Sequence, residues 1–243
     1  AFSELKKIRF DFPHKGKMDS WVSKRFHPQT FRELIFLKHF VANEMKNSVL
    51  RDLALLALID STLRASHVER LGASLRRVKK GYLPIKKFWL QKLEYMLKDL
   101  KKITAEGPEP VVWDDDARQL KHVEDESIAT IITSPPYLNK IEYTQAYKLE
   151  LALFFDAPST QLRSFVGENV RESEADEAGN PPIVHAYLSD MEKCLKQMER
   201  VLVPGGKAVI NVAGGCFPDR IVKSDDMLIQ KALETGFVLE DNI

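Results

Sequence analysis

The chain has few of the residues that cross-link small domains or bind structural metals. Its 243 residues include only 2 cysteines, Cys194 and Cys216, which excludes a disulfide framework and a cysteine-rich metal site. The 6 histidines are scattered along the chain, and no two of them have the helical spacing of metal ligands. The sequence therefore predicts no resident metal.

Long apolar runs are also absent. No N-terminal segment resembles a signal peptide. The most apolar stretch, residues 50–63, is interrupted by Arg51, Asp52 and Asp60, so it is too short and too charged to span a bilayer. We expect a soluble, cytoplasmic protein with no membrane partner.

The net charge is nearly zero, but each half of the chain carries an excess of one sign. Residues 1–104 hold 23 Lys and Arg against 10 Asp and Glu, about +13, whereas residues 105–243 hold 13 against 25, about −12. A basic half indicates a polyanionic partner, and the alternative is a set of solvated helix faces. We favour a basic half that binds nucleic acid.

Helical periodicity dominates the first half of the chain. Thr30 and Glu33 have the spacing of a capping box at the start of a helix. Apolar spacings predict two further helices, over residues 48–65 and 85–103. The first of these two is apolar almost all round, which places it at the centre of a helical bundle. We therefore predict a basic helical domain over residues 1–104.

A basic segment, residues 69–87, is interrupted by glycine and proline between the last two of these helices. Basic side chains on such a flexible connection can neutralise phosphates, and a neighbouring ring such as Tyr82 can stack on bases. The alternative is a solvated loop between helices. We predict nucleic-acid binding by six basic residues of this segment: Arg76, Arg77, Lys79, Lys80, Lys86 and Lys87.

The pattern of the second half changes to alternating strands and helices, after a boundary rich in Gly and Pro at residues 105–110. We expect strands at residues 111–113, 127–132, 207–212 and 237–239, and helices at about 142–155, 184–202 and 225–235. This alternation predicts an α/β fold, with a mostly parallel sheet and helices on its faces. We assign it to a second domain, residues 105–243.

Ser134-Pro135-Pro136-Tyr137 follows the apolar, β-branched strand expected at residues 127–132. A strand cannot continue through two prolines, because proline has no N–H and its φ is fixed. The chain therefore leaves the sheet at its carboxyl edge, where open α/β sheets bind ligands. A small polar side chain, two rigid residues and an aromatic ring are presented there together. This predicts a site for a flat, amino-bearing molecule; the alternative is a rigid surface turn.

Ser-Pro-Pro-Tyr at a strand end, preceded by the acidic stretch that ends at Asp116, resembles the catalytic motif of the amino-group DNA methyltransferases. The segment after the motif, residues 138–151, and the helix–turn–strand block over residues 187–212 are similar to the same family. The resemblance covers most of residues 20–240. It implies a class I methyltransferase domain with a Rossmann-like sheet, S-adenosylmethionine as the methyl donor and DNA as the substrate.

The resemblance also implies a role for each residue of the motif. The exocyclic amine of cytosine or adenine is a poor nucleophile, and two hydrogen-bond acceptors would orient its lone pair at the methyl donor. By resemblance, the Ser134 side chain and the Pro135 carbonyl are these acceptors, and Pro136 helps to fix their geometry. Tyr137 would stack on a base flipped out of the duplex. Asp116 would contact the adenine of the cofactor, or else serve only as a turn acid.

Serine in the first position of the motif goes with cytosine N4 methylation more often than with adenine N6 methylation in this family. The family's glycine-rich turn, which follows a strand and opens a helix, is not found in this sequence, and Gly214-Gly215 does not supply it. We therefore expect an incomplete sheet and an inactive chain. Either the chain is a fragment, or a partner chain or segment supplies the cofactor-binding unit, or catalysis is lost. The sequence is also compatible with an adenine-N6 or RNA-base methyltransferase and with a non-catalytic DNA-binding subunit.

Overall fold

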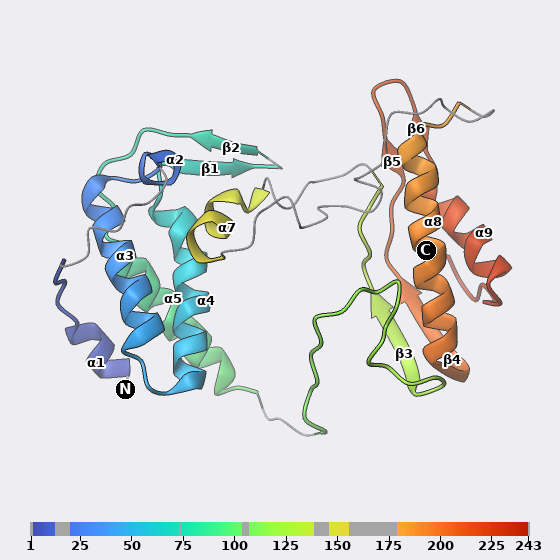
Figure 1. The fold of residues 1–243 in the computed structure, drawn as a ribbon, viewed down its shortest axis with the longest axis horizontal. Coiled ribbons are helices and arrows are strands. Elements are labelled where there is room, and N and C mark those ends of the chain that lie inside the picture. The colour runs from blue at the N-terminus through green and yellow to red at the C-terminus, as the bar shows by residue number, and fades with distance from the viewer. Residues whose placement is uncertain are drawn as a thin grey trace. The chain divides into compact units, whose positions relative to one another are not determined.

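The computed structural model describes residues 2–12, 20–72, 74–103, 107–138, 146–155 and 179–242. The chain forms two compact units (Figure 1). The first unit contains residues 1–108 and 143–161, and the second contains residues 109–142 and 162–243. The chain thus returns to the first unit after residue 142, a crossing that the pattern of the sequence does not indicate.

The first unit is mostly helical. Its helices are α1 (Phe2–Lys7), α2 (Ser20–Ser23), α3 (Pro28–Asn43), α4 (Ser48–Ala65), α5 (Ile85–Leu100) and α7 (Lys148–Phe154). The helix expected over residues 48–65 is confirmed with the same bounds, and the next one ends three residues earlier than expected. Of the helix expected over residues 142–155, residues 142–145 lie outside the described part of the chain.

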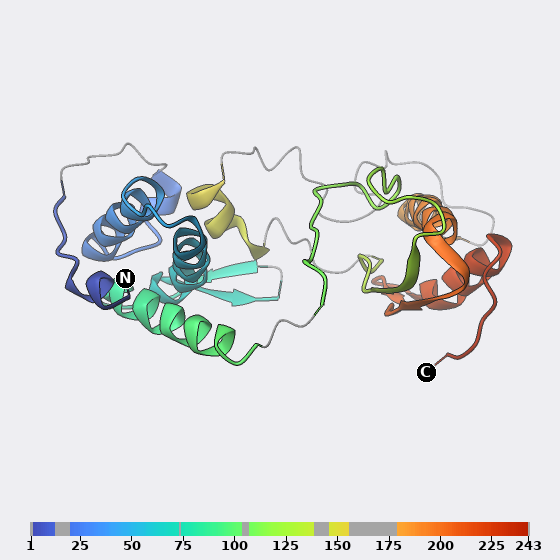
Figure 2. The same cartoon turned by 90° about the horizontal axis from the view of Figure 1, so that it is seen from below.

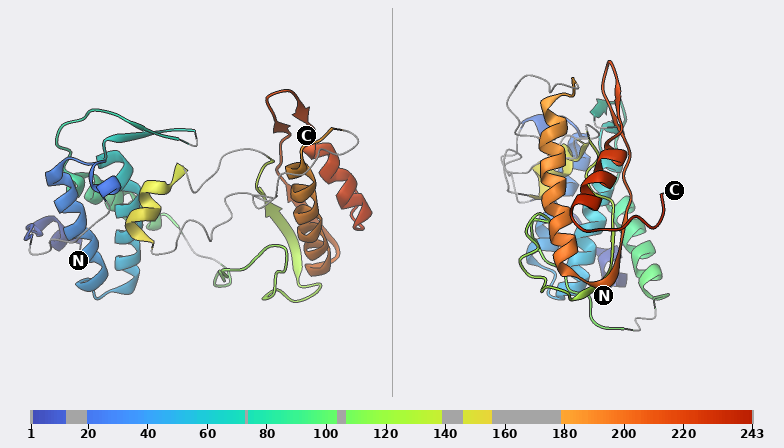
Figure 3. Two further views of the ribbon diagram at one scale, coloured as in Figure 1. Left: turned by 45° about the horizontal axis from the view of Figure 1, so that its top comes forward. Right: turned by 90° about the vertical axis from the view of Figure 1, so that its right-hand side faces the viewer.

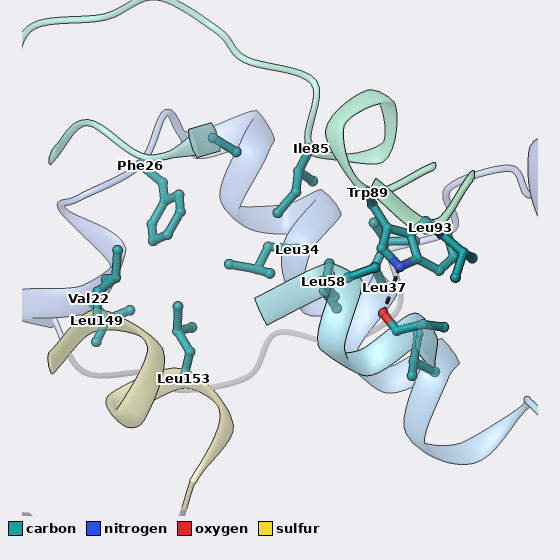
Figure 4. Packing of buried hydrophobic residues seen from close by; sticks show 14 of the residues in the cluster. Val22, Phe26, Leu34, Leu37, Leu58, Ile85, Trp89, Leu93, Leu149 and Leu153 are labelled. Carbon is teal, nitrogen blue, oxygen red and sulfur yellow. Dashed lines mark hydrogen bonds between the residues drawn. The ribbon is translucent and has the colours of Figure 1, made fainter. Parts of the chain in front are cut away.

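One apolar core holds the first unit together (Figure 4). It joins Leu34 of α3, Leu58 of α4, Trp89 of α5 and Leu153 of α7, all of them fully buried. Trp89 also donates its indole N–H to the carbonyl of Ala54 at 2.9 Å, so its one polar group is satisfied inside the core. The central position expected for α4 is therefore confirmed, because α3, which precedes it, and α5 and α7, which follow it, all pack against it.

The capping box expected at Thr30 is wrong. Helix α3 begins two residues earlier, at Pro28, and the ring nitrogen of His27 accepts the N–H of Gln29 at 3.2 Å. Proline suits the first turn because its missing N–H would have no partner there in any case. The Thr30 hydroxyl instead donates to the carbonyl of Leu83 at 2.7 Å. A long-range contact has taken the place of the local cap.

The segment 69–87, expected to be a flexible connection, contains two paired strands and the first turn of α5. Strand β1 (Val68–Leu71) pairs antiparallel with β2 (Ser74–Arg77), and Gly72 in the turn between them has a φ of +57°, which favours glycine. Beyond the hairpin, the Tyr82 hydroxyl donates to the buried carboxylate of Glu33 at 2.5 Å. This contact fastens the segment before α5 onto α3.

The second unit consists of a small parallel sheet and the helices beside it (Figure 3). Its elements are β3 (Ile128–Thr133), α8 (Pro182–Val201), β4 (Leu202–Ile210), β5 (Gly215–Cys216), β6 (Ile221–Val222) and α9 (Ser224–Glu234). Strands β3 and β4 are parallel, and β5 pairs antiparallel with β6. The helices expected over residues 184–202 and 225–235 are confirmed as α8 and α9, and α9 packs against α8.

In the helix–turn–strand block over residues 187–212, Pro204-Gly205-Gly206 lies inside β4 rather than in a turn ahead of the strand expected at residues 207–212. Ile128 is paired with Leu202, whereas Thr130 is paired with Lys207, so the register shifts between these positions. A Cβ atom at Gly206 would lie only 2.9 Å from the Val203 carbonyl. The close approach of backbone at this irregularity therefore requires glycine.

Two of the expected strands are not formed. Residues 111–113 and 237–239 lie in no strand of the described chain, and Val112 and Val238 are 91% and 84% exposed. Strand β3 is parallel as expected, but it is not buried as its apolar, β-branched composition suggests, because Ile132 is 80% exposed. A strand requires hydrogen-bonding neighbours on its edges and a packed layer on its faces, and apolar composition provides neither.

Candidate functional site

The Ser134-Pro135-Pro136-Tyr137 motif lies at the carboxyl end of the parallel strand pair. Strand β3 ends at Thr133, and the Thr133 carbonyl accepts the N–H of Asn211, the residue that follows β4, at 2.9 Å. The two strands therefore end side by side, and the prolines, which have no N–H, cannot extend the ladder. The exit of the chain at this edge agrees with the sequence prediction.

The Ser134 hydroxyl is exposed and lies between two oxygen atoms. It donates to the carbonyl of Asn211 at 3.4 Å, and it is 3.3 Å from the Tyr137 hydroxyl, where either oxygen can be the donor. A hydroxyl has one proton and two lone pairs. While its proton is directed at Asn211, Ser134 accepts from Tyr137 and has a second lone pair for a further donor. The geometry thus suits Ser134 to accept an N–H.

Tyr137 is half-buried, and the residue that follows it is anchored in the second unit. Leu138 is 1% exposed and packs in an apolar cluster with Val184 and Tyr187 of α8. A Cβ atom at Gly215 would lie 2.7 Å from the Leu138 side chain, so the small residue makes room for this anchor. The packing of Leu138 therefore holds the backbone next to the Tyr137 ring in place.

Tyr187 packs in the same cluster as Leu138, beside the motif, and the sequence analysis did not identify it. It is 1% exposed, and its hydroxyl oxygen has no hydrogen-bond partner among the described residues. Burial, followed by the nearby Cys194 thiol and Tyr137 phenol, raises the pKa of Tyr187 to about 12. Its helical spacing is that of a core residue. The one signal in the sequence was a hydroxyl at a position expected to be in the core, because a buried tyrosine normally has a hydrogen-bond partner for that group.

Asp116 is engaged by a neighbouring arginine. Its two carboxylate oxygens accept from the Arg118 guanidinium at 2.6 to 3.1 Å, and one of them also accepts the Arg118 N–H at 2.9 Å. Arg118 reaches Asp190 of α8 at 3.1 Å as well. The hydrogen bonds from Asp116 and then Asp190 raise the pKa of Arg118 above its usual value. This arrangement matches the turn-acid alternative, because a contact of Asp116 with a cofactor would have to displace Arg118.

Four of the six basic residues predicted to bind nucleic acid lie on or beside β2. Arg76 and Arg77 are successive residues of the strand, so their side chains project to opposite faces of the hairpin. Arg76 and Lys80 lie 3.3 and 3.8 Å from the carboxylate of Glu69. Lys79 is exposed just beyond the strand. The basic residues that are continuous in the sequence are therefore distributed over two faces of the hairpin.

The other two, Lys86 and Lys87, lie in the first turn of α5. The Lys86 ammonium donates to the carbonyls of Lys6 and Ile8 at 3.0 and 2.5 Å. These bonds satisfy carbonyl groups at and beyond the end of α1, which have no partner within the helix. Lys86 thus has a structural role that the sequence analysis did not predict, whereas Lys87 is exposed.

The described part of the chain contains neither a candidate metal cluster nor a membrane-spanning helix. There, no group of three or more His, Cys, Asp or Glu side chains is placed to hold a metal ion. No helix among the same residues is both long and apolar enough to cross a membrane.

Two curated proteins, both named type II methyltransferases, are similar to the chain. It is 29% identical over 133 residues to M.MjaI of Methanocaldococcus jannaschii, a match that covers 51% of this chain and 40% of that protein. It is 26% identical over 158 residues to M.BsoBI of Geobacillus stearothermophilus, covering 52% of this chain and 31% of that protein. The chain thus spans less than half the length of either relative. No protein-family model matches the chain, and no solved structure matches it.

These similarities support a methyltransferase. They agree with the resemblance carried by the Ser-Pro-Pro-Tyr motif, and they do not distinguish between target bases. They also say nothing about the role of each site residue, which has to be argued from the geometry around Ser134–Tyr137.

Proposed function

We propose that this chain carries the acceptor site of a DNA methyltransferase, which moves a methyl group from S-adenosylmethionine to the exocyclic amine of a base. The main support is the position of Ser134–Tyr137 at the carboxyl end of the parallel pair β3 and β4. In this proposal the two strands, with α8 and α9, are part of a class I, Rossmann-like sheet. The similarity to two type II methyltransferases favours the same chemistry.

Ser134 and Pro135 hold the amine in this proposal. The amine nitrogen attacks well only when both of its N–H groups are bound and its lone pair points away from the ring. The Ser134 oxygen accepts one N–H, because its own proton is directed at the Asn211 carbonyl. The Pro135 carbonyl accepts the second N–H, and the two prolines keep these acceptors in place at little entropic cost.

Tyr137 stacks on the target base. A base inside a duplex hides its amine, so the enzyme must extrude the nucleotide before it reacts. The half-buried ring offers an aromatic face, and the packing of Leu138 beneath Gly215 keeps its backbone in position. Because the motif begins with serine, we favour N4 of cytosine as the target. Adenine N6 and an RNA base are the alternatives.

The donor side of the reaction does not fit the described residues alone. S-adenosylmethionine would supply an electrophilic methyl group. Asp116, predicted to contact its adenine, has both carboxylate oxygens bound to Arg118. Within the described residues, no glycine-rich turn that opens a helix follows β3 or β4. We therefore propose that a further segment or a partner chain supplies the cofactor-binding unit, and that this chain alone is inactive.

Tritium transfer from labelled S-adenosylmethionine into DNA tests the acceptor site, in the complete protein or together with its partner chain. We expect Ser134→Ala and Tyr137→Ala each to lower the rate by about 100-fold, the effect of removing one positioning group from an active site. Ser127→Ala, just before the opposite end of β3, serves as a matched control and should leave the rate unchanged. Unchanged transfer in both site variants would show that Ser134 and Tyr137 do not form the acceptor site. Digestion of the product to nucleosides would then identify the methylated base.

A non-catalytic DNA-binding subunit is the second candidate. The engagement of Asp116 by Arg118 and the basic charge of residues 1–104 favour it. Calorimetry separates the two functions, because a catalytic protein binds both DNA and S-adenosylmethionine. A complete protein that binds DNA but no cofactor would support the second candidate.

A further inference from the structure

Helices α2 and α7, which are far apart in the sequence, pack against each other in the first unit (Figures 1 and 2). Val22 of α2 and Leu149 of α7 belong to the same apolar core, and both are buried (Figure 4). The residue before each of them is not buried: Trp21 is half-buried and Lys148 is exposed. The packing of the core therefore brings together outer side chains from distant parts of the chain.

Two positively charged side chains share the ring of Trp21. The Arg25 guanidinium lies 4.8 Å from the centre of this ring, and the Lys148 ammonium lies 5.2 Å from the same point. Both distances are within the range of cation–π attraction, about 6 Å. One cation beside a surface ring is ordinary. Two of them at one ring are like charges held within about one Debye length, roughly 10 Å at 0.1 M salt, so they repel each other.

This repulsion is not relieved by a carboxylate in the described part of the chain. Neither Arg25 nor Lys148 forms an ion pair or a side-chain hydrogen bond with another described residue. Glu150, on the same helix as Lys148, is bound by Arg70 at 2.7 Å. The neighbouring Lys24 is exposed and adds a further positive charge. Positive charge at fixed positions without counter-charges favours a polyanionic partner.

The basic residues that the sequence predicts to bind nucleic acid are less available. Arg76 and Lys80 share the carboxylate of Glu69, at 3.3 and 3.8 Å. Lys86 donates to two backbone carbonyls. A phosphate has to displace these partners, whereas beside the Trp21 ring it displaces only water. The tertiary structure thus offers phosphates a second place, which is not a continuous basic run in the sequence.

We propose that Trp21, Arg25 and Lys148 form a phosphate-binding site, the α2–α7 surface, which binds the backbone of the substrate DNA. This inference rests on the proposed function, because DNA is the polyanion that the reaction requires. Each cation neutralises a phosphate and releases its counterions. The ring holds both side chains in place, which reduces the entropy lost on binding. Contacts to the backbone carry no sequence information, so the α2–α7 surface binds DNA of any sequence.

The salt dependence of DNA binding tests the α2–α7 surface without any need for methyl transfer. Fluorescence anisotropy of a labelled duplex would be measured with the complete protein in about 50 to 200 mM KCl, where log K falls linearly with log[salt] in proportion to the phosphates neutralised. We expect the double variant Arg25→Met, Lys148→Met to make this slope shallower by about 2 and to weaken binding by about 10-fold at physiological salt. The loss should be the same for unrelated DNA sequences.

A matched control removes two positive charges from α5 of the same unit. Lys98 and Lys102 are paired with Glu94 and Asp99, at 3.0 Å each, so carboxylates already neutralise them. The double variant Lys98→Met, Lys102→Met should therefore change the slope by less than about 0.5. An unchanged slope without Arg25 and Lys148, or an equal change in the two double variants, overturns the proposal.

A charge-conserving variant separates charge from folding. Arg25→Lys combined with Lys148→Arg keeps both cations and should retain the wild-type slope, because the site binds phosphates through charge. Loss of the slope in this variant, with circular dichroism unchanged, overturns the proposal.

Methyl transfer by the same variants keeps this inference distinct from the proposed function. Removal of both cations should raise KM for DNA by about 10-fold and leave kcat unchanged, since contacts to the backbone bind ground state and transition state alike. A slope that depends on the two cations in a protein that transfers no methyl group retains the α2–α7 surface and removes the proposed function. Methyl transfer with a slope that does not depend on them removes the α2–α7 surface alone.

Discussion

The two units of the chain both bury apolar side chains against helices, but they do so to different extents. In the first unit, Leu34, Leu58 and Trp89 are fully buried in one continuous core. In the second, smaller clusters surround α8, while Ile132 and Val209, paired on one face of the sheet, are 80% and 57% exposed. Helices complete their own backbone hydrogen bonds, whereas two strands leave edges and a face to be covered. A few helices can therefore satisfy their backbone groups and bury their apolar side chains, whereas two strands need further elements to do so.

Trp89 tests the first side of this comparison and should show the largest effect. Trp89→Ala removes a fully buried ring from the core and its hydrogen bond to Ala54. We expect the free energy of unfolding of the first unit to fall by about 3 to 5 kcal/mol, measured by urea denaturation followed by circular dichroism. Tyr95→Ala, at a 53% exposed position of the same helix, should cost less than about 0.5 kcal/mol. Similar losses in the two variants would show that the core is not continuous.

Arg70 tests whether the returning segment, residues 143–161, belongs to the first unit. Arg70→Met leaves the Glu150 carboxylate, 7% exposed, without its cation. We expect a loss of about 3 kcal/mol in the unfolding transition of that unit, and recovery of most of it in the double variant with Glu150→Met. Arg51→Met, in an exposed pair with Asp52, should have an effect below about 0.5 kcal/mol. A loss confined to the second unit would contradict this placement.

Ile131 and Ile132 test the two faces of β3. Ile131 packs against the cluster of Cys194 and Met198 on α8, whereas Ile132 points away from it. We expect Ile131→Ala to lower the free energy of unfolding of the second unit by about 2 kcal/mol and Ile132→Ala to lower it by less than about 0.5 kcal/mol. Denaturation of both variants in the complete protein would sharpen the comparison. An equal cost at Ile132 there would show that another element covers its face.

The same substitution at two tyrosines should give different results in the two units. Tyr82→Phe removes a hydrogen bond from the buried carboxylate of Glu33 and should cost about 1 kcal/mol. Tyr187→Phe removes a hydroxyl that has no partner among the described residues, and its effect should stay within about 0.5 kcal/mol. Urea denaturation compares them directly. A large cost at Tyr187 would indicate that its hydroxyl has a partner in solution.

The titration of these tyrosines gives the corresponding dependence on pH. Burial, together with the hydrogen bond to Glu33, raises the pKa of Tyr82 from 10.0 to about 12, and burial raises that of Tyr187 to about 12 as well. Both pKa values are higher in the folded than in the unfolded chain. Their contribution to stability is therefore fully present below pH 10 and is lost as the pH rises through about 12. Ultraviolet absorbance titration should show one fewer late-ionising phenol in each phenylalanine variant.

Elements with local hydrogen bonds were predictable from the sequence, and those that depend on distant partners were not. The bounds of α4 follow from apolar spacing alone, as do those of α8 and α9 within a few residues, because each helix closes its bonds within itself. Residues 111–113 and 237–239 have strand composition, yet their state depends on a neighbouring strand. Thr30 likewise has the pattern of a cap but is drawn to Leu83, far along the chain.

The candidate site divides in the same way. By itself, the sequence determined that the chain must leave the sheet at Ser134–Tyr137, because two prolines cannot continue a strand wherever it lies. Only the tertiary structure decided what surrounds that exit: the Asn211 carbonyl that orients the Ser134 hydroxyl and the buried phenol of Tyr187. These groups come from the end of β4 and from α8, about fifty or more positions away in the chain. Backbone chemistry acts between neighbours in sequence, whereas hydrogen-bond partners and burial are set by packing.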